Sequence, residues 1–203
     1  MKRIILKTAL LLLLFSILCG CTREEFMDLY GFTERFTYSE LSPEDFFIGE
    51  SEKDNYFYTC FDTKNSVVML KLTPTENNKI GEVRIYLPKY DENVNEKPVT
   101  TDDINIFIRI VSSSVQAFTG YDENISEDII NQMQLYEKKS YEYKGELTKT
   151  KDNFHFMYHS ASLGSEFIIY NTYLKCVPET EKPESRPMYG DTTKIRTETV
   201  PTK

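Results

Sequence analysis

The sequence has no block of basic residues. It contains 24 Lys and Arg against 32 Asp and Glu, for a formal net charge of −8 at pH 7. Proteins that bind nucleic acid neutralise backbone phosphates with clustered Lys and Arg. We therefore expect no nucleic-acid partner.

The sequence also lacks the common catalytic motifs. It has no G-x-S-x-G, no Walker loop, no dinucleotide-binding glycine pattern, no C-x-x-C and no S-x-x-K with its partners. The triplet Ser112-Ser113-Ser114 has no Lys or His at a known nucleophile spacing, so we interpret it as small residues that let a helix pack closely. Cys60 would need His155 or His159 beside it to act as a catalytic thiol. We predict no catalytic residue and no cofactor, and we do not expect an enzyme.

The sequence has few His and Cys side chains, two and four, which are the common ligands of transition metals. Its two histidines, His155 and His159, lie in an alternating run that reads as a strand, where such a pair is about 13 Å apart and cannot share one ion. The acidic motif Tyr-Asp-Glu-Asn occurs at 90–93 and at 121–124, but neither copy has the Gly and the Glu that an EF-hand loop requires at its sixth and twelfth positions. We predict no metal site.

No apolar run is long enough to span a bilayer. Residues 1–7 carry three positive charges, and residues 8–19 form an uncharged run of twelve residues. As a helix, this run would be about 18 Å long, shorter than the roughly 30 Å hydrocarbon core. This pattern is typical of a signal peptide, the alternative being an uncleaved N-terminal anchor.

The end of that run is Leu18-Cys19-Gly20-Cys21. It resembles the lipobox of bacterial lipoproteins, in which a small residue precedes the Cys that receives diacylglycerol before cleavage. Cys19 departs from the Ala, Ser, Thr or Val usual at its position. The resemblance implies that residues 1–20 are removed and that Cys21 becomes a lipidated N-terminus, which holds the protein outside the cytoplasm on the bacterial membrane. Cleavage leaves a net charge of −11, so the folded surface should not seek anionic headgroups.

Two cysteines, Cys60 and Cys176, then remain in an exported domain. A disulfide between them would close 117 residues and contribute about 4.7 kcal/mol in the chain-entropy model. The alternative is two separate, partly buried thiols.

Alternating apolar residues predict six strands. They lie at residues 55–61, 66–73, 80–87, 141–148, 154–160 and 166–174. The last run is apolar on both faces, as in a central strand.

Two helices are predicted between the third and fourth strands. Thr100 or Thr101 caps the first helix and Gly120 follows its end, with an apolar stripe from Ile104 to Phe118 between them. The second helix begins at Ser126 and ends near Lys138. The order βββ-αα-βββ predicts an α+β fold, with two helices on one face of an antiparallel sheet.

The predicted domain covers residues 36–177. Residues 21–35 read as a tether, in which Gly31 ends a short helical turn, and Ser42 marks another short helix start. Residues 178–203 carry four Pro and six Thr with mixed charges, which predicts a disordered polar tail.

Tyrosine is the prominent aromatic residue, with 14 Tyr and no Trp. In the strand assignment, six of them could gather on the sheet face away from the helices: Tyr56, Tyr58, Tyr86, Tyr141, Tyr143 and Tyr170. Tyr offers contact area and a polar tip, which suits a protein or glycan surface. The alternative is an ordinary half-buried face. We expect a lipid-anchored binding module of the cell envelope. An envelope hydrolase that uses carboxylates, or a structural or immune-evading surface protein, is the alternative.

Overall fold

The computed structural model describes residues 26–36, 47–48, 56–90, 95–142 and 145–174. Six of our predictions lie outside these residues: the signal peptide, Cys21, the helix start at Ser42, Tyr143, Cys176 and the tail at 178–203.

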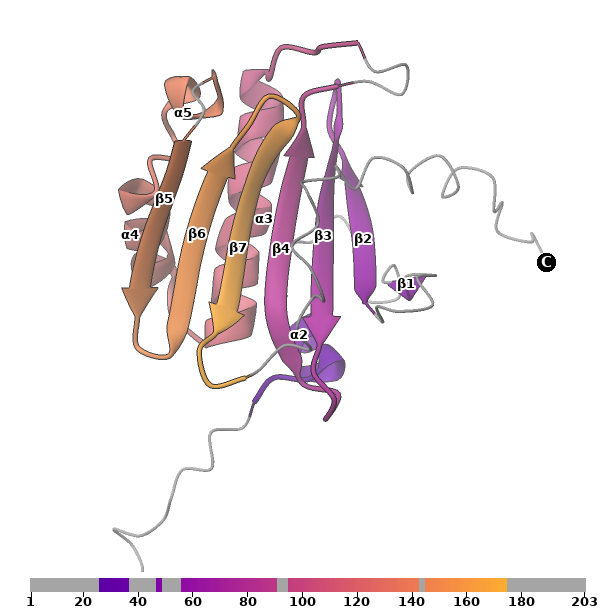
Figure 1. Cartoon of the computed structure of the whole chain (residues 1–203), viewed down its shortest axis with the longest axis vertical. Helices are drawn as coiled ribbons and strands as arrows, with labels where there is room; N and C mark the ends of the chain where they lie inside the picture. Colours follow the sequence, from indigo (N-terminus) through magenta and orange to yellow (C-terminus); the bar gives the residue numbers. More distant parts are fainter. Residues whose placement is uncertain (1–25, 37–46, 49–55, 91–94, 143–144, 175–203) are drawn as a thin grey trace, which may run out of the picture.

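The fold is built on one antiparallel sheet with the strand order β1-β2-β3-β4-β7-β6-β5 (Figure 1). The two-residue strand β1 (Phe47–Ile48) pairs with β2. The six longer strands are β2 (Phe57–Asp62), β3 (Val67–Pro74), β4 (Ile80–Pro88), β5 (Gly145–Lys151), β6 (Phe154–Ser160) and β7 (Gly164–Asn171). Strands β1 to β4 form one half of the sheet and strands β5 to β7 form the other. The two halves meet where β4 pairs with β7.

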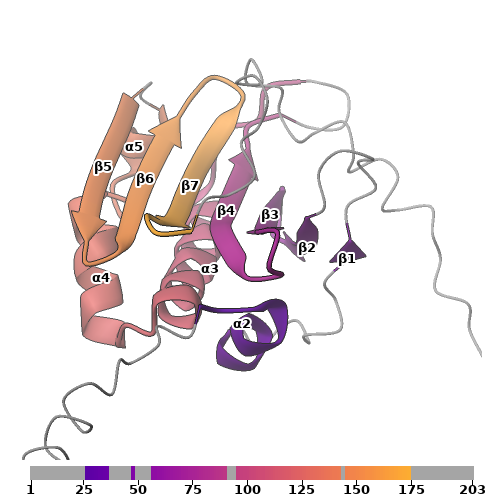
Figure 2. The same cartoon turned by 60° about the horizontal axis from the view of Figure 1, so that its bottom comes forward.

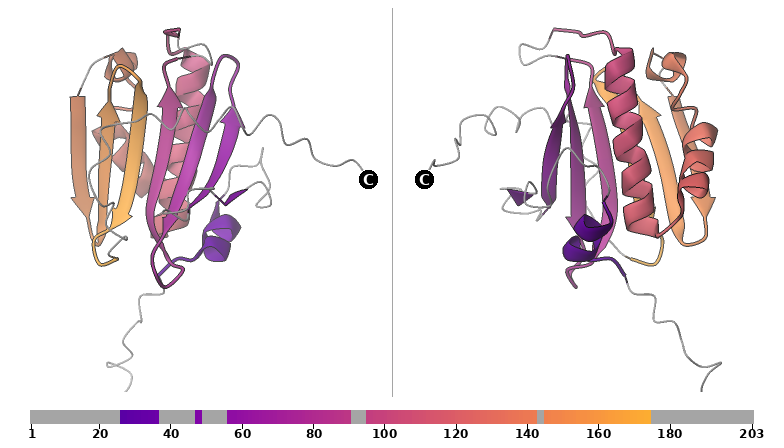
Figure 3. Two further views of the ribbon diagram at one scale, coloured as in Figure 1. Left: turned by 45° about the vertical axis from the view of Figure 1, so that its right-hand side comes forward. Right: turned by 180° about the vertical axis from the view of Figure 1, so that it is seen from behind.

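Within the described ranges, four helices accompany the sheet: α2 (Leu29–Arg35), α3 (Thr101–Thr119), α4 (Glu123–Gln132) and α5 (Lys138–Glu142). Seen from behind, α2, α3 and α4 all lie in front of the sheet (Figure 3). The helices therefore form one layer and the sheet the other. The predicted α+β fold, with its helices on one face, is confirmed.

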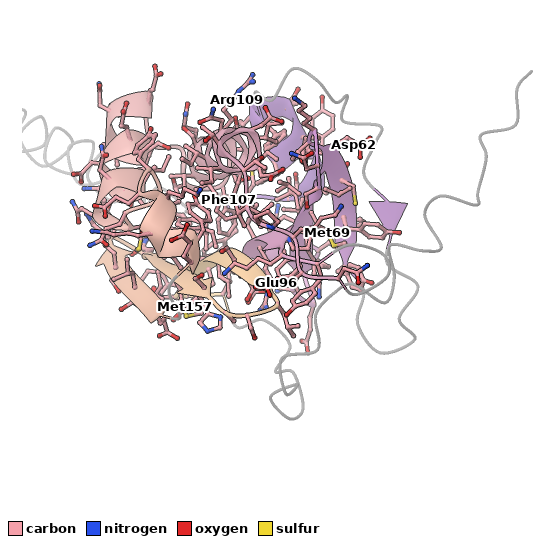
Figure 4. The ribbon with its side chains drawn as sticks, turned by 90° about the horizontal axis from the view of Figure 1, so that it is seen from above. Asp62, Met69, Glu96, Phe107, Arg109 and Met157 are labelled. Atoms are coloured by element: carbon pink, nitrogen blue, oxygen red, sulfur yellow. The ribbon has the colours of Figure 1, made fainter. Side chains whose placement is uncertain are left out.

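The apolar stripe of α3 holds the two layers together. Phe107, Val111 and Val115 are completely buried against strand residues that include Leu70 and Ile85. Viewed from above, Phe107 points from α3 toward the sheet, whereas Arg109 points away from it (Figure 4). Burial of one such apolar side chain contributes roughly 1.5–3 kcal/mol, so this stripe fixes which sheet face is covered.

Both ends of α3 follow the sequence prediction. Thr100 is the N-cap, and its side chain and that of Asp103 form a reciprocal capping box. Asp103 is 2% exposed and also accepts a hydrogen bond from the Thr63 hydroxyl, which ties the β2–β3 turn to the helix. Gly120 ends the helix with a φ of 76°, a left-handed conformation that favours glycine.

The N-terminal boundary of the predicted domain is wrong. Residues 29–35, assigned to a tether, form α2, whose Phe32 is completely buried in the core. Gly31 does not end this helix. A Cβ there would lie 2.8 Å from the sulfur of Met27, so glycine allows a close approach inside the helix.

The predicted second helix is also displaced. α4 begins at Glu123, capped by Asp122, and the segment up to Lys138 contains a separate turn before α5. Ser126, expected to start the helix, is instead buried inside it and lies 3.1 Å from the Ser112 hydroxyl. Ser113 and Ser114 are buried as well, so the interpretation of the triplet as close-packing residues is confirmed.

Gly164, at the start of β7, makes room for an aromatic ring. A Cβ at this position would lie 2.5 Å from ring atoms of Tyr86, whose hydroxyl donates to the Leu163 carbonyl at 2.9 Å. We expect Gly164→Ala to lower the free energy of unfolding by about 1–3 kcal/mol, because the ring must leave its place. Denaturant unfolding of G164A measures this loss.

Tyr86→Ala provides the control for that substitution. In the Tyr86→Ala background, Gly164→Ala should cost much less, because the clashing ring is gone. If Gly164→Ala lowers the free energy of unfolding equally with and without the Tyr86 ring, then a clash with Tyr86 does not explain why residue 164 is glycine.

Candidate functional site

The strongest candidate site is the sheet face away from the described helices, which we call the helix-free face. Strand register places these side chains on it: Tyr58 and Cys60 of β2, Met69 and Lys71 of β3, Glu82, Arg84 and Tyr86 of β4, Glu166, Ile168 and Tyr170 of β7, His155, Met157 and His159 of β6, and Glu146, Thr148 and Thr150 of β5. Tyr56 lies two residues before Tyr58 and therefore belongs to the same face. Figure 1 looks onto this face, with the helices behind the strands. Met157 lies on the opposite side of the sheet from α3 (Figure 4).

A charged group occupies the centre of the helix-free face. The Arg84 guanidinium binds Glu82 at 3.0 Å within β4 and Glu166 at 3.1 Å on β7. The three side chains are only 20–23% exposed. Such partly shielded ion pairs contribute roughly 1 kcal/mol each, so their main effect here is to fix the positions of the three groups.

The centre of this face is better shielded than its polar composition suggests. Ile168 is 4% exposed and Met69 is 6% exposed. The register places Ile168 between Arg84 and Met157, so long side chains flank this isoleucine from both neighbouring strands. The centre of the face therefore combines the ion pairs of Arg84 with shielded apolar side chains.

Two aromatic groups lie on either side of this centre. Toward the β2 edge, the rings of Tyr56 and Tyr58 are 5.8 Å apart, and the Lys71 ammonium lies 4.3 Å from the Tyr56 centroid. On the β6 side, the rings of His155 and Tyr170 are 4.8 Å apart. The two groups come from strands that are far apart in the sequence.

Four of the six predicted tyrosines lie on the helix-free face: Tyr56, Tyr58, Tyr86 and Tyr170. The prediction for Tyr141 is wrong. Tyr141 belongs to α5, is 1% exposed and donates its hydroxyl to the Leu135 carbonyl at 2.8 Å. Its ring packs edge-on against Phe107 and Tyr158, and burial raises its pKa.

Both histidines face the helix-free side of β6, four residues apart on a strand, as expected. His155 Nδ1 lies 2.8 Å from the Thr150 hydroxyl. Within the residues that the structure describes, no three His, Cys, Asp or Glu side chains come together in a group that could hold a metal ion. Asp122, which belongs to the acidic motif at 121–124, is the N-cap of α4.

Cys60 is a free thiol on β2 with no disulfide partner among the described residues. Burial, and secondarily the negative charge of Asp62, raise its pKa to about 11. A thiol with such a pKa is almost entirely protonated at neutral pH and is a poor nucleophile.

Strand register limits how Cys60 could reach Cys176. The register puts Cys60 of β2 in the same row across the sheet as Glu166 of β7, three strand spacings away. Strand β7 then continues for five more residues and ends at Asn171. These offsets place Cys60 about 22 Å from Asn171. The Asn171 carbonyl accepts from Leu174 N–H at 3.2 Å, so Leu174 stays within about 7 Å of Asn171. Two further residues add at most about 7 Å, and a disulfide adds at most about 6.8 Å between its Cα atoms, so the total reach only approaches this separation when every segment points straight at Cys60.

We therefore expect the alternative of two separate thiols. Alkylation in denaturant without reductant should modify both Cys60 and Cys176, whereas native Cys60 should resist at neutral pH because of its raised pKa. Mass spectrometry of tryptic peptides measures both. A Cys60–Cys176 linked peptide would contradict this expectation.

Sequence reasoning missed the group formed by Arg84, Glu82 and Glu166. The alternation of Glu82 and Arg84 placed both on the polar face of their strand, but Glu166 is 82 residues from Arg84 and only the β4–β7 pairing brings it there.

Comparison of the chain with protein-family models, with curated proteins and with solved structures finds no match. Among the described helices, none combines the length and the apolar character needed to cross a membrane. Function is therefore inferred from the side chains of this chain alone.

Proposed function

We propose that this chain is a lipid-anchored, extracytoplasmic binding module of the bacterial cell envelope. The N-terminal sequence supports the anchor, because Leu18-Cys19-Gly20-Cys21 resembles a lipobox after an uncharged run. Two or three acyl chains bind a bilayer stably, since each buried CH₂ contributes about 0.8 kcal/mol. The folded domain then needs no apolar membrane face of its own.

The helix-free face supports the binding role. The observation that carries it is the composition of this face: four Tyr, two Met and Arg84 in one surface that no described helix covers. Tyr, Met and Arg are enriched in protein interfaces, and Tyr and Arg are also enriched among the few residues that dominate the binding energy. A protein of the envelope therefore fits this surface better than a glycan.

The ion pairs of Arg84 favour binding over the alternative of a hydrolase. Glu82 and Glu166 both bind the same guanidinium, and it is these pairs that occupy the centre of the face. Glycoside hydrolysis instead uses two carboxyl groups that flank the substrate bond with room for the sugar between them.

Cys21→Ser tests the anchor. We expect the variant to lose its acyl groups and to keep residues 1–20, because the thioether can no longer form and acylation precedes cleavage. Intact-mass measurement detects both changes. Cys19→Ser is the matched control, and it should be acylated and cleaved like the unaltered protein. A Cys21→Ser protein that is processed to the same mature N-terminus as the unaltered protein, or an unaltered protein without acyl mass, would refute the anchor.

Replacement of surface tyrosines tests the binding face. Tyr56→Ser, Tyr58→Ser and Tyr170→Ser together should weaken capture of envelope partners at least about tenfold, because truncating a buried aromatic anchor commonly costs 2 kcal/mol or more. Quantitative mass spectrometry after chemical crosslinking in detergent extracts measures capture, and circular dichroism checks the fold.

Three exposed tyrosines away from this face provide the matched control. Tyr30, Tyr136 and Tyr173 are 72%, 53% and 66% exposed. Their joint replacement by Ser should leave capture unchanged. If the two triple variants behave alike, the helix-free face is not the binding surface.

A further inference from the structure

The N-terminal end of the described chain is attached firmly to one end of the sheet. Ile80 N–H donates to the Met27 carbonyl at 2.6 Å, and Asp28 forms an isolated antiparallel bridge with Lys79. The Lys79 ammonium also pairs with the Asp28 carboxylate at 3.2 Å. The Gly31 N–H, followed by Lys79, lowers the pKa of Asp28. The chain therefore enters the domain at the β3–β4 turn.

Helix α2 strengthens this attachment. Its Phe32 is completely buried, and the rings of Phe32 and Phe36 stack 5.7 Å apart. Figures 1 and 2 show α2 at the end of the molecule where β3 meets β4, beside the same end of α3. We call this the α2 end. The β6–β7 turn and the N-terminus of α3 lie at the opposite end.

Very little chain separates the proposed acylation site from this attachment. Cys21 precedes Phe26 by five residues, which span at most about 17 Å when fully extended. Strand β4 alone extends about 26 Å from its first residue to its last. The tether is therefore shorter than the body that it holds.

The α2 end also carries two of the three exposed large aromatic side chains of the described residues. Among the described residues, the exposed large hydrophobic side chains are Tyr30, Tyr136 and Tyr173. Tyr30 lies on α2, and Tyr173 lies in the turn after β7, where the neighbouring Thr172 binds Asn153 of the β5–β6 turn. Tyrosine rings favour the membrane–water interface, where the ring contacts the headgroup region and the hydroxyl stays hydrated.

We propose that the α2 end of the domain faces the anchoring membrane and contacts its lipid headgroups through Tyr30 and Tyr173. This inference depends on the proposed acylation of Cys21. The short tether keeps the β3–β4 turn near the bilayer, and the two tyrosines give that end its affinity for the headgroup layer. The strands then run away from the membrane surface, and the helix-free face points sideways, toward partners held at the same membrane.

Energy transfer to labelled lipid tests this orientation. Full-length acylated protein with Cys60→Ser and Cys176→Ser receives one donor dye, either at Asn77→Cys in the β3–β4 turn or at Ser162→Cys in the β6–β7 turn. Both positions are exposed. The protein is reconstituted into phosphatidylcholine vesicles that carry a rhodamine-labelled acceptor lipid. The offset of about 26 Å predicts that transfer from residue 77 is at least about twofold more efficient than from residue 162.

Two controls identify the cause of this difference. A long Gly-Ser insert between Arg23 and Glu24, combined with Tyr30→Ser and Tyr173→Ser, should abolish the difference, because neither the short tether nor the aromatic contact remains. Tyr136→Ser alone should leave it unchanged.

The outcomes separate this inference from the proposed function. Flotation with the vesicles and the acyl mass report the anchor itself. Equal transfer from the two positions in protein that floats, or greater transfer from residue 162, overturns the orientation and leaves the anchor standing. Protein that is not acylated contradicts the proposed function instead.

Discussion

The burial of the α3 stripe against β3 and β4 is the interaction on which the rest of the structure depends. A single 19-residue helix supplies Phe107, Val111 and Val115 to the core, and the matching strand residues all point to the same side. Once this side is covered, the opposite side chains of the same strands must form the second face. The period of two along each strand therefore decides which groups are presented together.

The sequence predicted this division because it depends on local periodicity. Val83 and Ile85 alternate with Glu82 and Arg84 along β4, so the apolar and polar sides of that strand are evident without a structure. The boundaries of α3 could also be predicted from the sequence, because Thr100 and Gly120 are typical capping residues at its two ends.

The errors arose where tertiary contacts outweigh local signals. Gly31 suggested a helix end, but the packing of Phe32 into the core keeps α2 intact around it. Tyr141 alternates like a strand residue, yet its burial against Phe107 places it on α5. The ion pair between Arg84 and Glu166 forms only because β4 and β7 are neighbours in the sheet, and local sequence patterns do not predict which strands pair.

The proposed anchor and the proposed binding face complement each other. In this proposal, the short tether after Cys21 would hold one end of the sheet near the membrane, and the helix-free face would extend outward from the bilayer. The fixed positions of Arg84, Glu82 and Glu166 make this face pre-organised, which lowers the entropy cost of binding a partner. The helix layer on the other side supplies stability.

Site-specific photo-crosslinking in the native envelope tests most directly whether the helix-free face is the working surface. The photoreactive group is placed at Thr148 on the helix-free face or at Asn105 on the outer side of α3, both of which are exposed. We predict crosslinked partner proteins from residue 148 and none from residue 105. The same partners from both positions, or partners from residue 105 alone, would contradict the account.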